Sequence, residues 1–277
     1  MITHRLNKRR ADLLDAEKRL CGASGHAIIA ALSEYVKEHF KRYYNIPQER
    51  ISVIPNGVKI PGEVDPDQAG NLHSRILAMF DITESSEPAI FLFAANNFRL
   101  KGLKTLLDAI ALLKKPDTKR PVYLVVAGSG RGAKYQMRAR KLGIAKQITF
   151  LGHLQNIRTA LSVSDVAVLP TWYDPSSRFI LEALASKKPV ITTRFNGAAE
   201  MFMNNRHGMI INDPADFNAL ADALNFCADP ENIKLFVDNI TADNLQEKIS
   251  IATHAELMIK LYKSVLQNRE TKWPRRL

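Results

Sequence analysis

The sequence predicts an α/β fold: a doubly wound, Rossmann-like parallel sheet with flanking helices. Two observations carry this prediction. Short, continuous apolar runs recur through the middle of the chain, and segments with helical periodicity separate them. Continuous apolar runs are typical of parallel strands that helices cover on both faces. Strands that alternate with helices in this way indicate one sheet within about residues 46–230.

Six runs are predicted to be buried strands because they are short, apolar and rich in β-branched residues. They occupy residues 89–95, 123–128, 148–152, 166–170, 189–193 and 208–211. After the first run, the segment KGLKTLLDAIALLKK places one apolar face on a helix, made of Leu103, Leu106, Leu107, Ile110 and Leu113. A second helix, RFILEALAS, is expected after the fourth run, and residues 213–267 predict further helices.

The region before the sheet predicts another helix. Apolar and aromatic residues recur there at helical spacing, namely Leu32, Tyr35, Val36, His39, Phe40 and Tyr43. Asn45-Ile46-Pro47 ends this pattern. We interpret His39 as a residue packed at the edge of a core rather than as a ligand. Residues 1–26 offer one helix with a ragged apolar face of Leu6, Leu13, Leu14 and Leu20.

Three segments follow from these patterns. Residues 1–45 are predicted to be N-terminal helices, residues 46–230 the Rossmann-like domain, and residues 231–277 C-terminal helices with a basic tail. The best candidate for a linker is the loop NGVKIPGEVDPDQAGN, residues 56–71, because it is rich in Pro and Gly. Within it, Asp65-Pro66-Asp67 mimics a metal-binding D-x-D motif, but it follows no strand, and we interpret it as a solvated turn.

The composition of the 277-residue chain fits a globular protein, with 46% hydrophobic residues. A net charge of +11 favours anionic partners such as nucleotide phosphates or acidic lipid surfaces. The basic residues are scattered without interleaved aromatics, which argues against nucleic acid. Cys21 and Cys227 have no metal-like spacing, and no segment resembles a signal peptide or a membrane span. We therefore expect a cytoplasmic protein.

Ligands of open parallel sheets bind beyond the carboxyl ends of the strands, so the residues after each run are the candidates for a site. Arg99 and Lys101 follow the first run at the start of a helix, where free amides and the helix dipole already favour an anion. This pattern predicts a phosphate site, although a solvated basic turn is also common. The G-x-G-x-G of residues 128–132 lacks the full dinucleotide fingerprint and is interpreted as a tight turn.

A more specific pattern follows the fourth run, where Asp174 and Glu182 are separated by seven residues. This spacing resembles the E-x7-E signature of the retaining GT-B glycosyltransferases of family 4, with Asp in place of the first Glu. Other motifs stand in the order of that family: Ser33-Glu34-Tyr35, ISVIPNGV (51–58), NNFRLKG (96–102), ITFLGH (148–153) and FNGAAEM (195–201). The resemblance covers most of residues 27–265. It is greatest to the transferases that build lipopolysaccharide core and other cell-envelope glycans.

The resemblance implies a role for each matching residue. As catalytic residues, Arg99 and Lys101 would pair with the diphosphate of a nucleotide sugar, and Asp174 would bind sugar hydroxyls. Glu182 would accept hydrogen bonds from the ribose. The rest of the donor site would be the amides of Ser176, Ser177 and Arg178 and, beside the base, Gly152 and His153. The expected donor is a UDP-hexose, and neither a metal nor another cofactor is expected.

The implied reaction is transfer of a hexose, with retention, from a nucleoside diphosphate sugar to a cell-envelope glycan or glycolipid acceptor. An enzyme of this type has an N-terminal acceptor domain, whereas here the linker pattern begins near residue 27. A start assigned too late, a separate N-terminal subunit and a donor-binding remnant without activity are all compatible with this. The alternative function is therefore a non-catalytic nucleotide-sugar-binding or donor-domain subunit.

Two further partners are expected. Basic termini predict peripheral contact with the inner face of the membrane, through Arg5, Lys8, Arg9, Arg10, Lys272, Arg275 and Arg276. Apolar helix faces predict self-association or binding of an N-terminal-domain partner.

Overall fold

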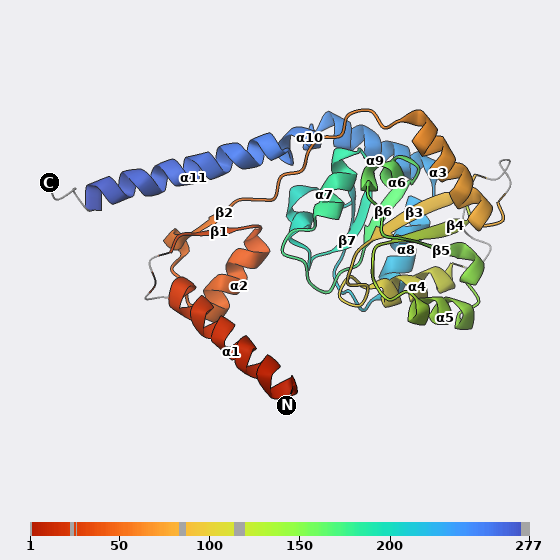
Figure 1. The fold of residues 1–277 in the computed structure, drawn as a ribbon. Coiled ribbons are helices and arrows are strands. Elements are labelled where there is room, and N and C mark those ends of the chain that lie inside the picture. Colours follow the sequence, from red (N-terminus) through yellow and green to blue (C-terminus); the bar gives the residue numbers. More distant parts are fainter. Residues whose placement is uncertain (1, 23–24, 26, 83–86, 114–119, 273–277) are drawn as a thin grey trace.

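All six predicted runs are strands of one parallel sheet (Figure 1). The computed structural model describes residues 2–22, 25, 27–82, 87–113 and 120–272. The strands are β3 (Ala89–Ala94), β4 (Val122–Ala127), β5 (Ile148–Gly152), β6 (Val166–Leu169), β7 (Val190–Thr193) and β8 (Gly208–Ile211). Their order across the sheet is β5-β4-β3-β6-β7-β8. The predicted fold class is confirmed.

The sheet changes its winding direction beside β3. The chain places β4 and then β5 on one side of β3, and it then returns to place β6, β7 and β8 on the other side. Phe91 of β3 is in register with Leu124 of β4 and with Val166 of β6. Such a switch point opens a crevice at the carboxyl ends of the two central strands, where α/β sheets bind their ligands.

Helices cover both faces of the sheet, which explains why its strands are apolar throughout (Figure 1). On one face α4 (Leu103–Leu112) packs against α5 (Ala133–Lys141) and α8 (Phe217–Cys227). On the other face α3 (Pro66–Met79) packs against α6 (Ile157–Ser162), and α7 (Arg178–Ala185) lies against β6 and β7. Phe91, Leu92 and Phe93 of β3 are fully buried between these layers. Burying each such side chain contributes about 1.5–3 kcal/mol.

A second, smaller sheet lies before the large one. It pairs β1 (Ile29–Ala31) in parallel with β2 (Ile51–Val53), and α2 (Glu34–Tyr44) with a 3₁₀ turn, η1 (Gln48–Arg50), connects the two strands. Its small core consists of Ile29, Ala31, Ile46 and Ile51. We call residues 29–53 the β1–α2–β2 unit. This unit joins residues on both sides of the boundary expected at residue 46.

The helix expected before the sheet is confirmed as α2, but its apolar residues divide between two partners. Val36 and Phe40 pack on the small core. Tyr35 and His39 instead contact Tyr173 of the large domain, with the His39 and Tyr173 rings stacked at 5.8 Å. Asn45 ends α2 in a left-handed conformation, with φ of 51°. His39 is thus a packing residue at an edge, as expected.

Asp65, Pro66 and Asp67 are exposed to solvent, as expected, but the interpretation of these residues as a turn is wrong, because they begin α3. The Asp65 side chain accepts a hydrogen bond from Asp67 N at 3.0 Å, and Pro66 is the first helical residue. An acidic N-cap followed by proline is a frequent helix start, since the side chain satisfies a free amide and proline has no amide to lose. The linker between the sheets is therefore shorter than residues 56–71.

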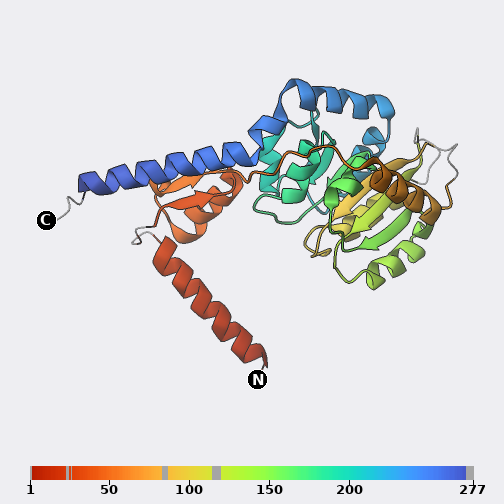
Figure 2. The ribbon, with the colours of Figure 1, turned by 45° about the horizontal axis from the view of Figure 1, so that its top comes forward.

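The C-terminal region is helical, as expected, with α9 (Pro230–Ala242), α10 (Leu245–Lys248) and α11 (Ile251–Lys272) after α8. Figures 1 and 2 show α11 extending from the large domain on the same side as the β1–α2–β2 unit. Near its start, the His254 ring bonds Pro55 O through Nδ1 at 2.7 Å. Ahead of the unit, α1 (Ile2–Cys21) exposes Leu13, Leu14 and Leu20. None of the described helices is both long enough and apolar enough to span a membrane.

Cys21 and Cys227 are both free cysteines. Burial raises the pKa of the Cys227 thiol to about 12.

Candidate functional site

An ion pair between Lys101 and Asp174 occupies the switch point of the large sheet. Lys101 follows β3 and Asp174 follows β6, and Lys101 Nζ lies 2.6 Å from Asp174 Oδ2. The same ammonium donates to Tyr173 O at 3.1 Å. Both side chains are largely buried, with 19% of Lys101 and 13% of Asp174 exposed. The structure thus joins two of the predicted catalytic residues, which are distant in sequence.

The loop that carries Lys101 is held by its own hydrogen bonds. Lys101 N donates to Asn97 O at 3.0 Å, and Leu100 N donates to Asn97 Oδ1 at 3.1 Å. Gly102 then turns the chain into α4 with φ of 79°, and a Cβ there would lie 1.9 Å from Pro170 O. Only glycine fits this position, because both the left-handed backbone and the close approach exclude a side chain. The β3 and β6 loops are therefore packed together.

The backbone around Asp174 is tied to the turn that follows β7. Asp174 N donates to Phe195 O at 2.9 Å, and Gly197 N donates to Asp174 O at 2.9 Å. The carboxylate also accepts a hydrogen bond from Ser176 N, at 3.2 Å from Oδ1. Both carboxylate oxygens of Asp174 therefore already have partners within the chain.

Asn196, in the turn after β7, holds the backbone of the site by hydrogen bonds. It was not predicted as a site residue. Its Oδ1 accepts from Ser177 N and Ala198 N, each at 3.1 Å, and its Nδ2 donates to Thr192 Oγ1 at 3.0 Å. The side chain is buried, with 1% of the residue exposed. The sequence signals were the Asn-Gly turn and the motif FNGAAEM, and neither indicated the partner of Asn196 across the site.

The β1–α2–β2 unit braces the same loop from the other side. Ser33 Oγ donates to Pro175 O at 2.8 Å, and Asn56 Nδ2, just after the unit, donates to Ser176 O at 3.1 Å. Glu200, in the 3₁₀ turn η3 (Gly197–Met201), accepts from the first amides of α2. Residues 173–177 thus lie where the large domain contacts the β1–α2–β2 unit.

The predicted donor-binding residues of α7 lie at its start and on its second turn. Ser176 N donates a hydrogen bond to the Asp174 side chain, and Ser177 N donates one to the Asn196 side chain. Arg178 begins α7, so its amide has no acceptor within the helix. The Ser176 hydroxyl is buried and has no hydrogen-bond partner among the described residues.

Glu182 is the acidic residue of an otherwise apolar helix, and 27% of its side chain is exposed. Burial raises the pKa of Glu182 above its usual range, against the lowering effects of Arg178 and Arg158. The Arg178 guanidinium lies 3.6 Å from the Glu182 carboxylate, but 70% of the Arg178 side chain is exposed. Such an exposed pair contributes little to stability. Glu182 is therefore a partly desolvated carboxylate at the edge of the site.

The remaining predicted residues are more exposed. Arg99 lies in the loop after β3, and in the described part of the chain no hydrogen bond or ion pair joins it to the Lys101–Asp174 pair. Gly152 ends β5 with φ of 72°, and its carbonyl accepts from Gly128 N at 2.7 Å. His153 is exposed. The roles predicted for these three residues, like those of the other site residues, remain predictions.

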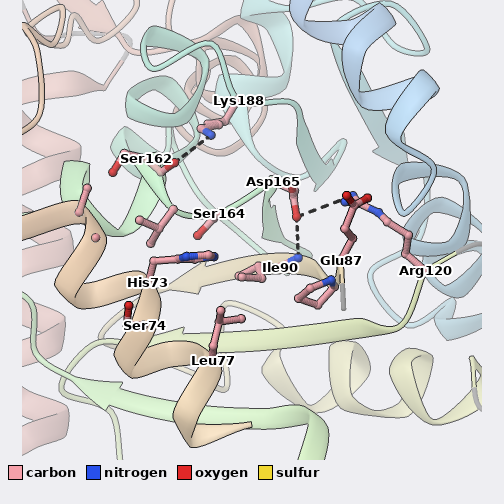
Figure 3. A pocket seen from close by; sticks show the side chains of 14 residues that line it. His73, Ser74, Leu77, Glu87, Ile90, Arg120, Ser162, Ser164, Asp165 and Lys188 are labelled. Carbon is pink, nitrogen blue, oxygen red and sulfur yellow. Dashed lines mark hydrogen bonds and ion pairs between the residues drawn. The ribbon is translucent and has the colours of Figure 1, made fainter. Parts of the chain in front are cut away.

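A cavity of about 700 Å³ lies at the opposite edge of the sheet, where the strands begin (Figure 3). Asp165 accepts from Ile90 N at 2.7 Å and lies 3.7 Å from the Arg120 guanidinium. Burial lowers the pKa of Lys188, whose Nζ donates to Ser162 O at 3.3 Å. These groups hold the starts of the strands together, and the length of the sheet separates this cavity from the switch-point ion pair.

No group of three or more His, Cys, Asp or Glu side chains arranged to hold a metal ion occurs among the described residues.

Comparison with known proteins gives this site its context. The family model for glycosyl transferases group 1 matches residues 74–250, and the model for glycosyltransferase family 4 matches residues 1–60. An uncharacterized glycosyltransferase of Methanocaldococcus jannaschii is 24% identical over 243 residues, which are 86% of this chain and 60% of that protein. The lipopolysaccharide glucosyltransferase WaaG of Escherichia coli is 23% identical over 185 residues, 67% of this chain and 48% of WaaG.

The solved structures agree with the fold. Anabaena HepE, in complex with UDP and glucose, superposes with a TM-score of 0.76 at 20% identity, covering 91% of this chain and 66% of HepE. The chain spans about half the length of the curated relatives it matches. Because the group 1 model covers well over half of the sequence, and because the parallel sheet is that of the GT-B structures, this chain belongs to the glycosyl transferases group 1 family.

Proposed function

We propose that this chain binds a nucleoside diphosphate sugar and takes part in the transfer of its hexose, with retention, to a cell-envelope glycan or glycolipid. The observation that carries the proposal is the buried Lys101–Asp174 ion pair at the switch point. A cation and a carboxylate held 2.6 Å apart at the mouth of the crevice match the two ends of such a donor. The diphosphate needs positive charge, and the sugar needs hydrogen-bond acceptors.

In this proposal Lys101 binds the diphosphate and stabilises the charge that develops on it as the glycosidic bond breaks. A preorganised cation in a partly buried site is effective for this purpose, because it needs no reorganisation at the moment of reaction. The hydrogen bond from Lys101 Nζ to Tyr173 O holds the ammonium at the switch point. Arg99, on the same loop, adds a second cation. Together they replace a metal ion, so donor binding is expected without divalent cations.

Glu182 and Ser176 fit the other parts of the donor. A partly desolvated carboxylate such as Glu182 gains most from a diol that donates two hydrogen bonds, as a ribose does. The unpartnered Ser176 hydroxyl is a polar atom that a donor oxygen can satisfy. The HepE complexes with UDP and with UDP-glucose support UDP as the nucleotide.

One observation favours the alternative, a non-catalytic donor-binding subunit. Both oxygens of Asp174 are already bonded, one to Lys101 and one to Ser176 N. A sugar must compete with these bonds before Asp174 can contact it. The carboxylate is also one methylene shorter than the Glu of the E-x7-E pattern. Asp174 is therefore the residue on which the choice between enzyme and binding subunit depends.

Calorimetry with UDP in the presence of EDTA tests the donor site. We expect binding that EDTA leaves unchanged, and no heat at all with any nucleoside diphosphate would refute the site. Assays with labelled UDP-glucose and UDP-galactose and a lipid extract then test transfer, and NMR of the product reports the anomeric configuration. If the chain binds UDP but transfers no hexose, even when it is mixed with an N-terminal domain from a relative, the result supports the non-catalytic alternative.

Two expectations on partners and location remain proposals. Contact with the inner face of the membrane was assigned to basic termini; Arg275, Arg276 and the side chains of Arg5, Lys8, Arg9, Arg10 and Lys272 lie outside the described residues. Self-association or binding of an N-terminal domain is supported by exposed apolar side chains of α11, namely Ile259, Tyr262 and Leu266. Light scattering at two protein concentrations tests self-association, because the average mass of a self-associating protein rises with its concentration.

A further inference from the structure

A groove of about 1080 Å³ lies between α4, α5 and the start of α8, outside the Lys101–Asp174 pair. We call it the α4–α5 groove. Its lining combines exposed apolar side chains with five cationic ones and a single carboxylate, that of Asp108; one of the cations, Arg99, is also assigned to the donor diphosphate. Three of the apolar lining residues are exposed: Trp172 by 47%, Phe217 by 40% and Met137 of α5 by 56%. Large apolar side chains gathered at a groove indicate a binding surface.

The charge of the groove is only partly compensated within the chain. Asp108 already binds two of the cations, with Lys104 Nζ at 3.0 Å and Arg138 Nε at 2.7 Å. In the part of the chain that the structure describes, no carboxylate pairs with Lys134 or Lys141. Residues 121–164, which include α5, contain seven Lys and Arg and no Asp or Glu. This part of the surface therefore attracts anions.

We propose that the α4–α5 groove binds a saccharide chain that carries phosphate or carboxylate groups. The exposed indole of Trp172 offers a flat apolar face to the C–H side of a sugar ring, and Lys134 and Lys141 bind its anionic groups as point charges. The surface is hollowed, which suits a chain-like ligand better than a flat bilayer.

The loops after β3 and after β6 line the groove, and the same two loops carry Lys101 and Asp174. Trp172 N donates to Leu100 O at 2.9 Å, so the loop before Asp174 is fastened to the loop before Lys101. A saccharide in the groove contacts these loops from the outside, while the donor contacts them from the crevice. The ligand is then the acceptor glycan, and this assignment of acceptor class rests on the proposed function.

Tryptophan fluorescence tests the proposal directly, because Trp172 lines the groove and the second tryptophan of the sequence, Trp273, can be replaced. In a Trp273→Phe background, maltotetraose 6-phosphate is compared with neutral maltotetraose, with inorganic phosphate and with vesicles of phosphatidylcholine and phosphatidylglycerol. We expect the phosphorylated saccharide to change the Trp172 emission with an affinity at least tenfold higher than that of either neutral maltotetraose or inorganic phosphate.

The variant Lys134→Ala/Lys141→Ala is expected to lose at least tenfold in this affinity. Its matched control is Arg140→Ala/Lys146→Ala, which removes two exposed cations of the same region that do not line the groove. Equal weakening by both double variants would show general charge attraction and overturn the proposal. Equal affinity for phosphorylated and neutral maltotetraose would also overturn it, as would vesicle binding that depends on Lys134 and Lys141 without any saccharide binding.

Calorimetry with UDP on the same variants separates this proposal from the donor site. Both double variants are expected to bind UDP like the parent protein. Saccharide binding in a protein that binds no nucleoside diphosphate would leave the groove assigned and refute the proposed donor site instead.

Discussion

The Glu200 carboxylate accepts a hydrogen bond from Tyr35 N at 2.7 Å, and its second oxygen accepts from the neighbouring amide, Glu34 N, at the same distance. A side chain of the large domain thus satisfies two free amides at the start of α2, where the helix dipole also favours negative charge. This contact fastens the β1–α2–β2 unit to the turn beside Asp174.

Replacement of Glu200 by Gln is therefore expected to destabilise the junction between the two parts. The loss of an acidic cap costs about 1 kcal/mol, within the usual range for helix caps. Urea unfolding followed by circular dichroism measures it. The control is Glu38→Gln on the exposed side of α2, where the carboxylate pairs with Lys41. Equal effects of the two substitutions would show that Glu200 does not act as a cap.

Lys101→Ala is expected to weaken UDP binding by about 1.5–3 kcal/mol, the range for a hydrogen bond to a charged group. The free nucleoside uridine should bind equally to both proteins, since it has no phosphate. Calorimetry with both ligands measures the difference. The matched control is Lys104→Ala, whose exposed side chain pairs with Asp108 on α4. A similar loss of uridine affinity would contradict the assignment of Lys101 to the phosphates.

The large sheet was predictable because each of its strands is buried on both faces and therefore reads as a continuous apolar run. The small sheet was not, because β1 and β2 have three residues each and pair only across α2. Among the site residues, the sequence indicated Lys101 and Asp174 separately, through their positions after strands. Their ion pair depends on the adjacency of β3 and β6, which is a property of topology rather than of local sequence.

The positioning residues were missed for a related reason. Asn196, Ser33 and Glu200 act by hydrogen bonds to backbone atoms that are distant in sequence. Such contacts produce no periodic pattern of residue types along the sequence, so the sequence does not indicate them. The start of α3 was the opposite case, a local signal in Asp65-Pro66 that was interpreted as a turn.

Asn196→Ala should destabilise the protein and disorder the loop that carries Asp174. It leaves the amides of Ser177 and Ala198 without their acceptor in a buried region, which costs about 1–3 kcal/mol for each unsatisfied group. Urea unfolding measures the stability, and UDP calorimetry measures the effect on the site. Asn204→Ala is the control, because Asn204 also accepts from an amide, Ile210 N, but at an exposed position. A loss no greater than that of the control would contradict the role of Asn196.

The raised pKa of Glu182 predicts opposite effects of mild acid on stability and on donor binding. Because burial raises this pKa in the folded protein, protonation of Glu182 favours the folded state. Its contribution to stability is complete below the pKa of the unfolded chain and is lost as pH rises through the folded pKa. Hydrogen bonds from ribose hydroxyls instead favour the ionised carboxylate.

UDP binding should therefore weaken as the pH falls from 7 toward 4.5, the ordinary pKa of a Glu side chain. Over the same interval Glu182 becomes protonated, and its burial then no longer lowers the stability of the folded protein. Glu182→Gln, which cannot ionise, provides the comparison. The ratio of wild-type to variant affinity for UDP cancels the protonation of UDP itself, so it isolates Glu182. We expect this ratio to fall as the pH is lowered, and the stability of the wild type relative to the variant to rise over the same interval. A ratio that does not change with pH would show that Glu182 makes no contact with the nucleotide.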